Sequence, residues 1–197
     1  MFTGIIETVG KINKLEHDGS NINLFVESPV DLDLKVDQSL SHNGVCLTVT
    51  SVQGKEHQVT IIEESLSKSN LGDLKPGSLV NLERCMPANG RFDGHVVQGH
   101  VDQTGTCVGR EEKDGSWLFH FEFDEDYSRN VTVEKGSICI NGVSLTCFNS
   151  EPGKFTVAII PYTYENTVFQ TLREGDKVNL EFDIIGKYVE RLLSKTS

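Results

Sequence analysis

The residues of this chain best suited to chemistry are a histidine, a cysteine and a serine. His100 carries an imidazole whose ordinary pKa of about 6.5 suits proton transfer in both directions near neutrality. Cys46 and Ser144 take the same place in two copies of one motif, Asn-Gly-Val-Cys-Leu-Thr at 43–48 and Asn-Gly-Val-Ser-Leu-Thr at 141–146. Purely structural roles stay open as alternatives, since a lone strand histidine is more often structural and a free cysteine is more often a small buried residue.

Metal chemistry is not indicated by these residues. His95 and His100 lie near Cys107, but a spacing of five on a strand points two side chains to opposite faces. The five cysteines are an odd number without Cys-x-x-Cys spacing, which argues against a structural zinc site or a disulfide framework. We expect reduced thiols and no metal.

The sequence also lacks the motifs of nucleotide-binding and acyl-transfer proteins. Residues 4–11 imitate a phosphate loop, but five residues separate the glycines where four are needed. No Gly-x-Gly-x-x-Gly follows a strand, and no Gly-x-Ser-x-Gly supports Ser144 as an acyl-transfer nucleophile. We therefore expect neither NAD nor ATP.

Charge and apolar content narrow the partners. Eighteen Lys and Arg against 29 Asp and Glu give a net charge of −11, the wrong sign for recruiting nucleic acid. The apolar runs are shorter than the roughly 18 residues of a membrane span, and the start of the chain lacks the pattern of a secretory signal. We expect a cytoplasmic protein that binds neither nucleic acid nor membrane.

An internal repeat must position the candidate residues. A shift of 98 carries Val-Asn-Leu-Glu at 80–83 onto the identical residues 178–181, while near the start a shift of 95 pairs residues 4–7 with 99–102. A three-residue insertion in an intervening loop explains the difference. Such a long period, seen only twice, indicates two copies of one domain, with a boundary near 86–96.

Each copy has the pattern of a small all-β barrel or sandwich. Short runs rich in Val, Ile, Thr and Phe are separated by turn signals every 8 to 12 residues or so. Asn43-Gly44 and Asn141-Gly142 predict tight type I′ hairpin turns, which need positive φ. Residues 184–194 change to a helical period, and this amphipathic helix either packs on its own barrel or mediates oligomerisation.

Several linked motifs, spread from end to end, resemble the riboflavin synthase α-chain family. The resemblance implies two six-stranded Greek-key barrels at 1–88 and 95–183, a C-terminal helix and tail at 184–197, and a homotrimer. It further implies an enzyme without a cofactor that holds two 6,7-dimethyl-8-ribityllumazine molecules per active site, and it raises an association with lumazine synthase. One lumazine would donate a four-carbon unit to the other, yielding riboflavin and 5-amino-6-(ribitylamino)uracil. The motifs are Met-Phe-Thr-Gly-Ile at 1–5, Asn-Gly-Val-Cys-Leu-Thr at 43–48, Gly-His-Val-Val-Gln-Gly-His-Val-Asp at 94–102, Gly-Ser-Ile-Cys-Ile-Asn-Gly-Val-Ser-Leu-Thr at 136–146 and Gly-Lys-Tyr-Val-Glu-Arg at 186–191.

The resemblance also distributes site residues over two similar pockets. His100 would transfer protons, with assistance from Cys46, Thr48, Ser144 and Asp183. The N-terminal pocket would be lined by Gly4, Ile5, Ile6, Cys46, Leu47, Thr48, Thr60, Ile61, Ile62, Glu63, Glu64 and Ser65, with Phe2 close by. The C-terminal pocket would be lined by Gly99, His100, Val101, Lys135, Ser144, Leu145, Thr146, Ala158, Ile159, Ile160, Pro161, Tyr162 and Thr163. Ser39 and Ser137 would reach ribityl hydroxyls or support the turns.

The duplication has a functional reading under this resemblance. A reaction that consumes two copies of one substrate needs two similar pockets that treat them differently, and Cys46 against Ser144 supplies such a difference. The sequence departs from the family at Ser41-His42, where small apolar residues are usual, and at Ser65, where threonine is usual. A non-catalytic lumazine- or flavin-binding protein on the same barrels is the main alternative, and a flavin-dependent reductase barrel is a weaker one.

Overall fold

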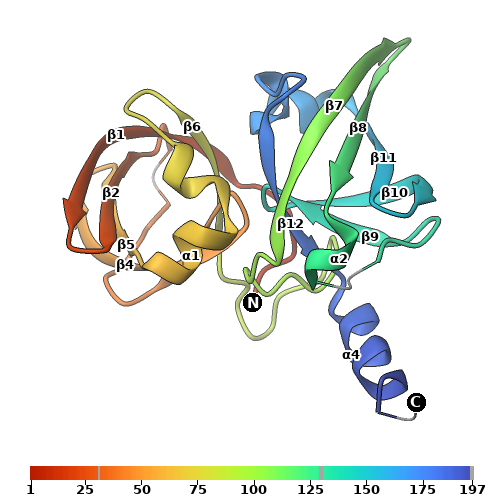
Figure 1. The fold of residues 1–197 in the computed structure, drawn as a ribbon. Coiled ribbons are helices and arrows are strands. Elements are labelled where there is room, and N and C mark those ends of the chain that lie inside the picture. Colours follow the sequence, from red (N-terminus) through yellow and green to blue (C-terminus); the bar gives the residue numbers. More distant parts are fainter. Residues whose placement is uncertain (31, 129–130, 196–197) are drawn as a thin grey trace.

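A computed structural model describes residues 1–30, 32–128 and 131–195 as two closed antiparallel barrels of six strands each (Figure 1). The all-β fold with tandem six-stranded barrels is thereby confirmed. The first barrel consists of β1 (Thr8–Asp18), β2 (Asn21–Glu27), β3 (Ser39–His42), β4 (Val45–Gln53), β5 (Glu56–Ile61) and β6 (Leu79–Arg84). The second consists of β7 (Gln103–Lys113), β8 (Ser116–Phe123), β9 (Ser137–Ile140), β10 (Val143–Glu151), β11 (Lys154–Ile159) and β12 (Lys177–Phe182).

The two barrels share one topology. Around the first barrel the strand order is β1-β2-β5-β4-β3-β6, and the second closes in the equivalent order. Short helices α1 (Glu63–Lys68) and α3 (Pro161–Glu165) follow β5 and β11, and the 3₁₀ helices η1 (Asn70–Asp73) and η2 (Val168–Gln170) come next. The short helix α2 (Glu125–Ser128) lies in the loop between β8 and β9, where the second copy carries its three extra residues.

The barrels differ in what fills them. Strand β2 alternates buried Ile22, Leu24 and Val26 with less buried neighbours, as a strand with one core face must. The first core is aliphatic, whereas the second contains a cluster of phenylalanines. Phe119 and Phe169 meet edge to face there at 5.1 Å between ring centroids. One topology therefore accommodates two different core packings.

The two barrels contact each other through their Asn-Gly turns. Asn43 and Asn141 have φ of 46° and their glycines 82° and 84°, which confirms the predicted hairpin turns. A Cβ added to Gly44 would lie 2.8 Å from the backbone nitrogen of Gly142, so only glycine permits this approach. The two turns therefore pack directly against each other.

The repeated Val-Asn-Leu-Glu motif supplies the polar contacts of this junction. The side-chain nitrogen of Asn81 donates to the Asn141 carbonyl at 2.8 Å, and that of Asn179 donates to the Asn43 carbonyl at 2.9 Å. Both asparagine side chains are almost fully buried. Each barrel therefore satisfies a turn carbonyl of the other, which a buried carbonyl requires.

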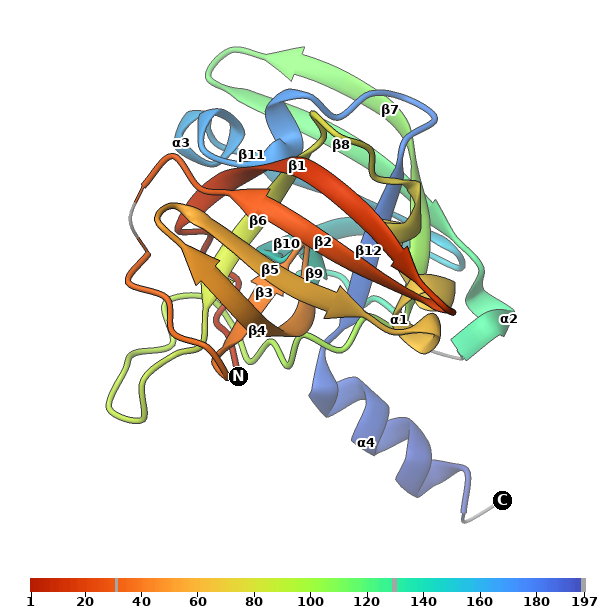
Figure 2. The same ribbon diagram turned by 90° about the vertical axis from the view of Figure 1, so that its left-hand side faces the viewer.

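Helix α4 (Ile184–Leu193) leaves the second barrel and projects away from both barrels (Figures 1 and 2). The predicted amphipathic helix is confirmed, with Asp183 at its N-cap accepting a hydrogen bond from the Ile185 amide. Its apolar side chains are largely exposed, with Ile185 at 69% and Leu192 at 65%. The helix therefore does not bury this face on its own barrel. Residues 196–197 of the predicted tail lie outside the described residues.

None of the helices in the described ranges is both long and apolar enough to cross a bilayer.

Candidate functional site

The segment that precedes each barrel crosses to the other barrel. Gly4, ahead of the first barrel, accepts a hydrogen bond at its carbonyl from the Ser144 amide at 2.8 Å. Gly99, ahead of the second barrel, likewise accepts one from the Cys46 amide at 2.9 Å. Ile6 correspondingly packs on the second core and Val101 on the first. The prediction that grouped residues 4–6 with Cys46, and 99–101 with Ser144, was wrong: the pairing is exchanged.

Both crossings depend on glycine. A Cβ on Gly4 would lie 2.5 Å from the Cβ of Ser144, and one on Gly99 would lie 2.6 Å from the Cβ of Cys46. Both glycines have positive φ, 78° and 80°, a region that side chains other than glycine adopt at a cost. The crossing backbone can therefore lie directly against the strands β4 and β10.

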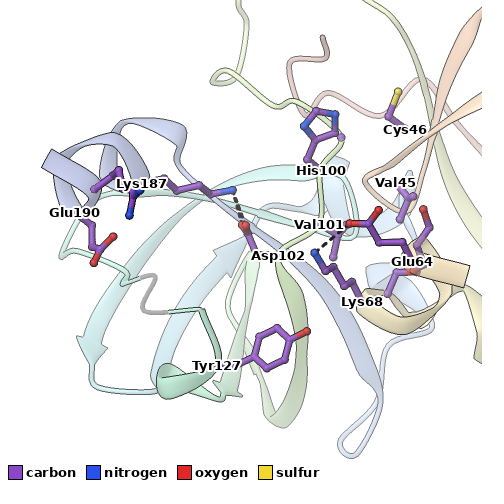
Figure 3. A pocket seen from close by; sticks show the side chains of 14 residues that line it. Val45, Cys46, Glu64, Lys68, His100, Val101, Asp102, Tyr127, Lys187 and Glu190 are labelled. Carbon is purple, nitrogen blue, oxygen red and sulfur yellow. Dashed lines mark hydrogen bonds and ion pairs between the residues drawn. The ribbon is translucent and has the colours of Figure 1, made fainter. Parts of the chain in front are cut away.

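A cavity of about 820 Å³ opens where the crossing segment meets the first barrel (Figure 3). Helix α1 contributes one wall, and Tyr127 of α2 and Lys187 of α4 contribute to the other. This volume is in the range of small-molecule sites. The predicted site residues Cys46, Glu64, Ser65, Gly99, His100 and Val101 all line it.

His100 lies on the segment that precedes the second barrel, and Cys46 lies on β4 of the first barrel. Both residues line this cavity (Figure 3). His100 is exposed, so water or a ligand reaches its imidazole. Burial raises the pKa of the Cys46 thiol, and a hydrogen bond with Ser39 partly offsets that rise. A thiol with a raised pKa is protonated at neutral pH, which favours the polar-contact role over the nucleophile role.

Ser144 lies in a different polar group, with a residue that sequence reasoning left out of the site. The Nδ1 of His95 is 2.7 Å from the Ser144 Oγ. Burial lowers the pKa of His95, and the nearby Asp183 carboxylate partly restores it. A neutral imidazole at this distance can exchange a proton with the hydroxyl. His95 was visible in the sequence as part of the motif at 94–102, but the only role considered for its side chain was metal binding.

The predicted catalytic residues thus separate into two groups. His100 and Cys46 belong to one, and Thr48 pairs with Ser39 on the adjacent strand β3. Ser144 and Asp183 belong to the other, joined through His95. Thr146 pairs with Ser137 there, as Thr48 does with Ser39. Cys46 and Ser144 are equivalent in the repeat, whereas both histidines come from the segment 94–102, so the two groups differ in chemistry.

Some predicted pocket residues point elsewhere. The side chains of Leu47, Ile61 and Ile159 are buried in the barrel cores, so only their backbones can contact a ligand. Leu145 packs partly against the second core. Phe2 is fully buried with Val97 and Cys139, as a core aromatic residue would be.

The remaining predicted residues lie at the surface or near it. Thr60 donates a hydrogen bond to the Asn23 side chain at 2.7 Å. Lys135 is exposed, and its ammonium lies 5.1 Å from the centre of the Phe148 ring. Other exposed or half-exposed positions are Ile5, Ile62, Glu63, Ala158, Ile160, Pro161, Tyr162 and Thr163.

Within residues 1–30, 32–128 and 131–195, His, Cys, Asp and Glu side chains do not gather in groups of three that could hold a metal ion.

Comparisons with known proteins agree with this arrangement. A lumazine-binding domain model matches residues 3–85 and again 98–183. The chain is 40% identical to a riboflavin synthase of Bacillus subtilis over all of its length and 92% of that protein. It is 41% identical to a riboflavin synthase of Actinobacillus pleuropneumoniae, covering 99% of this chain and 91% of that one.

A solved structure shares the fold. The crystal structure of LumP complexed with 6,7-dimethyl-8-(1'-D-ribityl) lumazine superposes with a TM-score of 0.83 at 21% identity, covering 92% of this chain and 98% of that one. The two domain matches and the full-length relatives show that the chain belongs to the riboflavin synthase family.

Proposed function

We propose that this protein converts two molecules of 6,7-dimethyl-8-ribityllumazine into riboflavin and 5-amino-6-(ribitylamino)uracil. The observation that carries the proposal is a pair of polar sites at equivalent positions of the repeated Asn-Gly-Val motif, where Cys46 lies with His100 and Ser144 with His95. A dismutation needs such a pair, because two identical molecules must be bound and treated differently. Full-length relatives named riboflavin synthase support the same reaction.

The reaction balances without a co-reactant. One lumazine gives up four carbons and becomes the aminouracil, and the other gains them and becomes riboflavin. Two carbon–nitrogen bonds of the donor break, two carbon–carbon bonds to the methyl carbons of the acceptor form, and protons move between the two molecules. The atoms and electrons therefore balance without an added oxidant or reductant. The protein must supply groups that move protons and hold two rings in register.

His100 is our candidate for proton transfer in the cavity beside Cys46. It is exposed to the cavity, and its side-chain type suits transfer near neutrality. The hydrogen-bonded Ser144 and His95 are the candidates at the second site. Of the other predicted binding residues, Glu64 and Ser65 of α1 line the first cavity. Backbone amides of the pocket are suited to hydrogen-bond the pyrimidine-dione edge of the lumazine.

The proposed assembly is a homotrimer built on helix α4. The exposed apolar residues of that helix include Ile185, Val189, Leu192 and Leu193. Covering such a face in a second copy of the chain removes it from water, which favours association. The two sites of a reacting pair would then belong to neighbouring subunits. Association with lumazine synthase stays a prediction, as does a cytoplasmic location, which unpaired cysteines favour.

One experiment distinguishes this enzyme from the non-catalytic binding protein that remains the alternative. Purified protein is incubated with 6,7-dimethyl-8-ribityllumazine alone, and riboflavin fluorescence is followed. The proposal expects one riboflavin for every two lumazines consumed. Bound lumazine without riboflavin would support the binding protein and contradict the enzyme.

A further inference from the structure

The carboxylate of Glu181, near the end of β12, holds the crossing segment that carries His100. One oxygen accepts the Gln98 amide at 2.6 Å, and the other accepts the amides of Gly99 at 2.9 Å and His100 at 2.8 Å. Glu181 is only 3% exposed. Three consecutive backbone donors converging on one buried carboxylate form a charge-assisted anchor, stronger than ordinary neutral hydrogen bonds.

This anchor reaches His100 and Cys46, two of the polar residues that line the 820 Å³ cavity. The amide of His100 is held directly, so the position of its Cα follows the carboxylate. The amide of Gly99 is held as well, and the Gly99 carbonyl in turn accepts the Cys46 amide at 2.9 Å. Glu181 is therefore connected to His100 by one hydrogen bond and to Cys46 by two.

Glu83 makes the equivalent anchor in the other half of the molecule. Its carboxylate accepts the Thr3 amide at 2.7 Å, the Thr3 hydroxyl at 2.9 Å and the Gly4 amide at 3.1 Å. The Gly4 carbonyl then accepts the Ser144 amide. Glu83 is likewise almost fully buried, at 4% exposed. The two glutamates thus form a matched pair at equivalent positions of the repeat.

Each glutamate serves the site of the barrel to which it does not belong. Glu181 is in the second barrel, but the segment it holds lies against Cys46 of the first. Glu83 is in the first barrel, but its segment lies against Ser144 of the second. The exchange of crossing segments produces this arrangement.

We propose that Glu181 is a positioning residue that sets His100 against Cys46, so that a residue of the second barrel controls the ligand site of the first. This inference rests on the proposed function for its kinetic part only. Burial raises the pKa of Glu181, and the hydrogen bonds from the amides of Gln98 and His100 lower it. The segment therefore stabilises the ionised carboxylate, and the carboxylate in turn holds the segment in place.

A role confined to fold stability is the competing explanation. It would weaken the protein without changing the geometry at His100 in molecules that remain folded. The Asp102 carboxylate already ties the same region to the fold, since it accepts the Phe182 amide at 2.9 Å and the Lys187 ammonium at 2.7 Å (Figure 3). The segment therefore stays attached when Glu181 changes, and the effect on His100 can be measured.

The test compares Glu181→Gln with Glu83→Gln, the substitution at the equivalent position of the repeat, in the full chain. Glutamine keeps the shape but replaces one accepting oxygen by an NH₂ group, so at least one backbone amide loses its acceptor. The readouts are the His100 imidazole and Cys46 amide NMR resonances without ligand, and kcat and KM for the lumazine. Circular dichroism verifies that each variant is folded.

Glu181→Gln is expected to shift both resonances and to lower kcat by about 10- to 100-fold, because misplacement by about 1 Å can cost about 100-fold. Glu83→Gln is expected to leave the His100 and Cys46 resonances in place. If Glu181→Gln fails to fold, Glu181→Asp, which withdraws the carboxylate by one methylene, must shift the same resonances. The proposal would be overturned if the His100 and Cys46 resonances did not move in a folded Glu181 variant. It would also be overturned if these resonances shifted equally in the Glu181 and Glu83 variants. Failure of the proposed function would appear separately, as wild-type protein that forms no riboflavin.

Discussion

Acidification should destabilise the first barrel selectively, because two histidines are buried in it as a neutral pair. The Nε2 atoms of His42 and His57 lie 2.8 Å apart, and the side chains are 0% and 2% exposed. The equivalent residues of the second barrel are Ile140 and Phe155, which cannot titrate. The two barrels should therefore respond differently to pH.

Hydrogen bonding assigns the protons of this pair. The Nδ1 of His42 faces the Leu40 carbonyl at 3.2 Å and must therefore carry hydrogen. The Nε2 of His42 is then an acceptor, so the Nε2 of His57 is the donor. The remaining lone pair is on His57 Nδ1, a buried atom for which the described residues supply no hydrogen-bond partner. A further proton would have to sit there, buried and without an acceptor among those residues.

Burial accordingly lowers the pKa of His57 to about 4 and that of His42 well below its ordinary value. In the unfolded chain both imidazoles take up protons near pH 6.5. Between these values the unfolded state binds more protons than the folded state, so stability falls as the pH falls. From a pKa of about 4 against 6.5, His57 alone should cost about 2 kcal/mol at about pH 5 and about 3 kcal/mol at about pH 4. His42 adds to the loss.

The matched variant replaces both residues by those of the second barrel, His42→Ile with His57→Phe. Urea denaturation between about pH 7 and about pH 4.5 gives the free energy of unfolding of each protein. Burial raises the pKa of Glu83 and of Glu181, which contributes in the opposite direction, but equally in both proteins. The difference between the proteins therefore isolates the histidines.

Hydrogen exchange locates the effect. All four tyrosines and the single tryptophan lie in the second half of the chain, so intrinsic fluorescence reports on that half alone. Amide protection of β3 to β5 should fall with pH in the wild type relative to β9 to β11, and it should not do so in the double variant. Equal acid sensitivity of the two proteins, or a loss confined to the second barrel, would refute the assignment of a neutral buried pair.

Three further substitutions test the other parts of the structure. Gly99→Ala should abolish riboflavin formation in a steady-state assay, since its Cβ would lie 2.6 Å from that of Cys46 and φ is 80°; activity near wild type would contradict the crossing geometry. Asn179→Ala should lower the free energy of unfolding in urea by about 2 to 4 kcal/mol, because the buried Asn43 carbonyl loses its donor along with other contacts; a loss below about 0.5 kcal/mol, typical of a surface change, would argue against the junction. Leu192→Asp, at a site 65% exposed, should leave the fold unchanged by circular dichroism but give monomers in sedimentation velocity; a persisting trimer would remove α4 from the assembly.

Local chemistry made much of the fold predictable. Asn43-Gly44 and Asn141-Gly142 announce tight turns because few other residue pairs adopt positive φ at both positions. The period change after Asp183 predicts α4 because apolar spacing follows the helical turn. The offset between the two Val-Asn-Leu-Glu copies predicts two equivalent domains. Each of these features is encoded within a few consecutive residues or in a direct repeat of them.

The organisation of the site was decided only by the tertiary structure. The exchange of the segments around Gly4 and Gly99, the anchors at Glu83 and Glu181, and the contact of His95 with Ser144 join residues that are far apart in the chain. Their partners are fixed by how two barrels pack at the Asn-Gly turns, and no periodicity in the sequence records that packing. Sequence alone therefore predicted two similar barrels, whereas the packing determined which barrel each predicted site residue contacts.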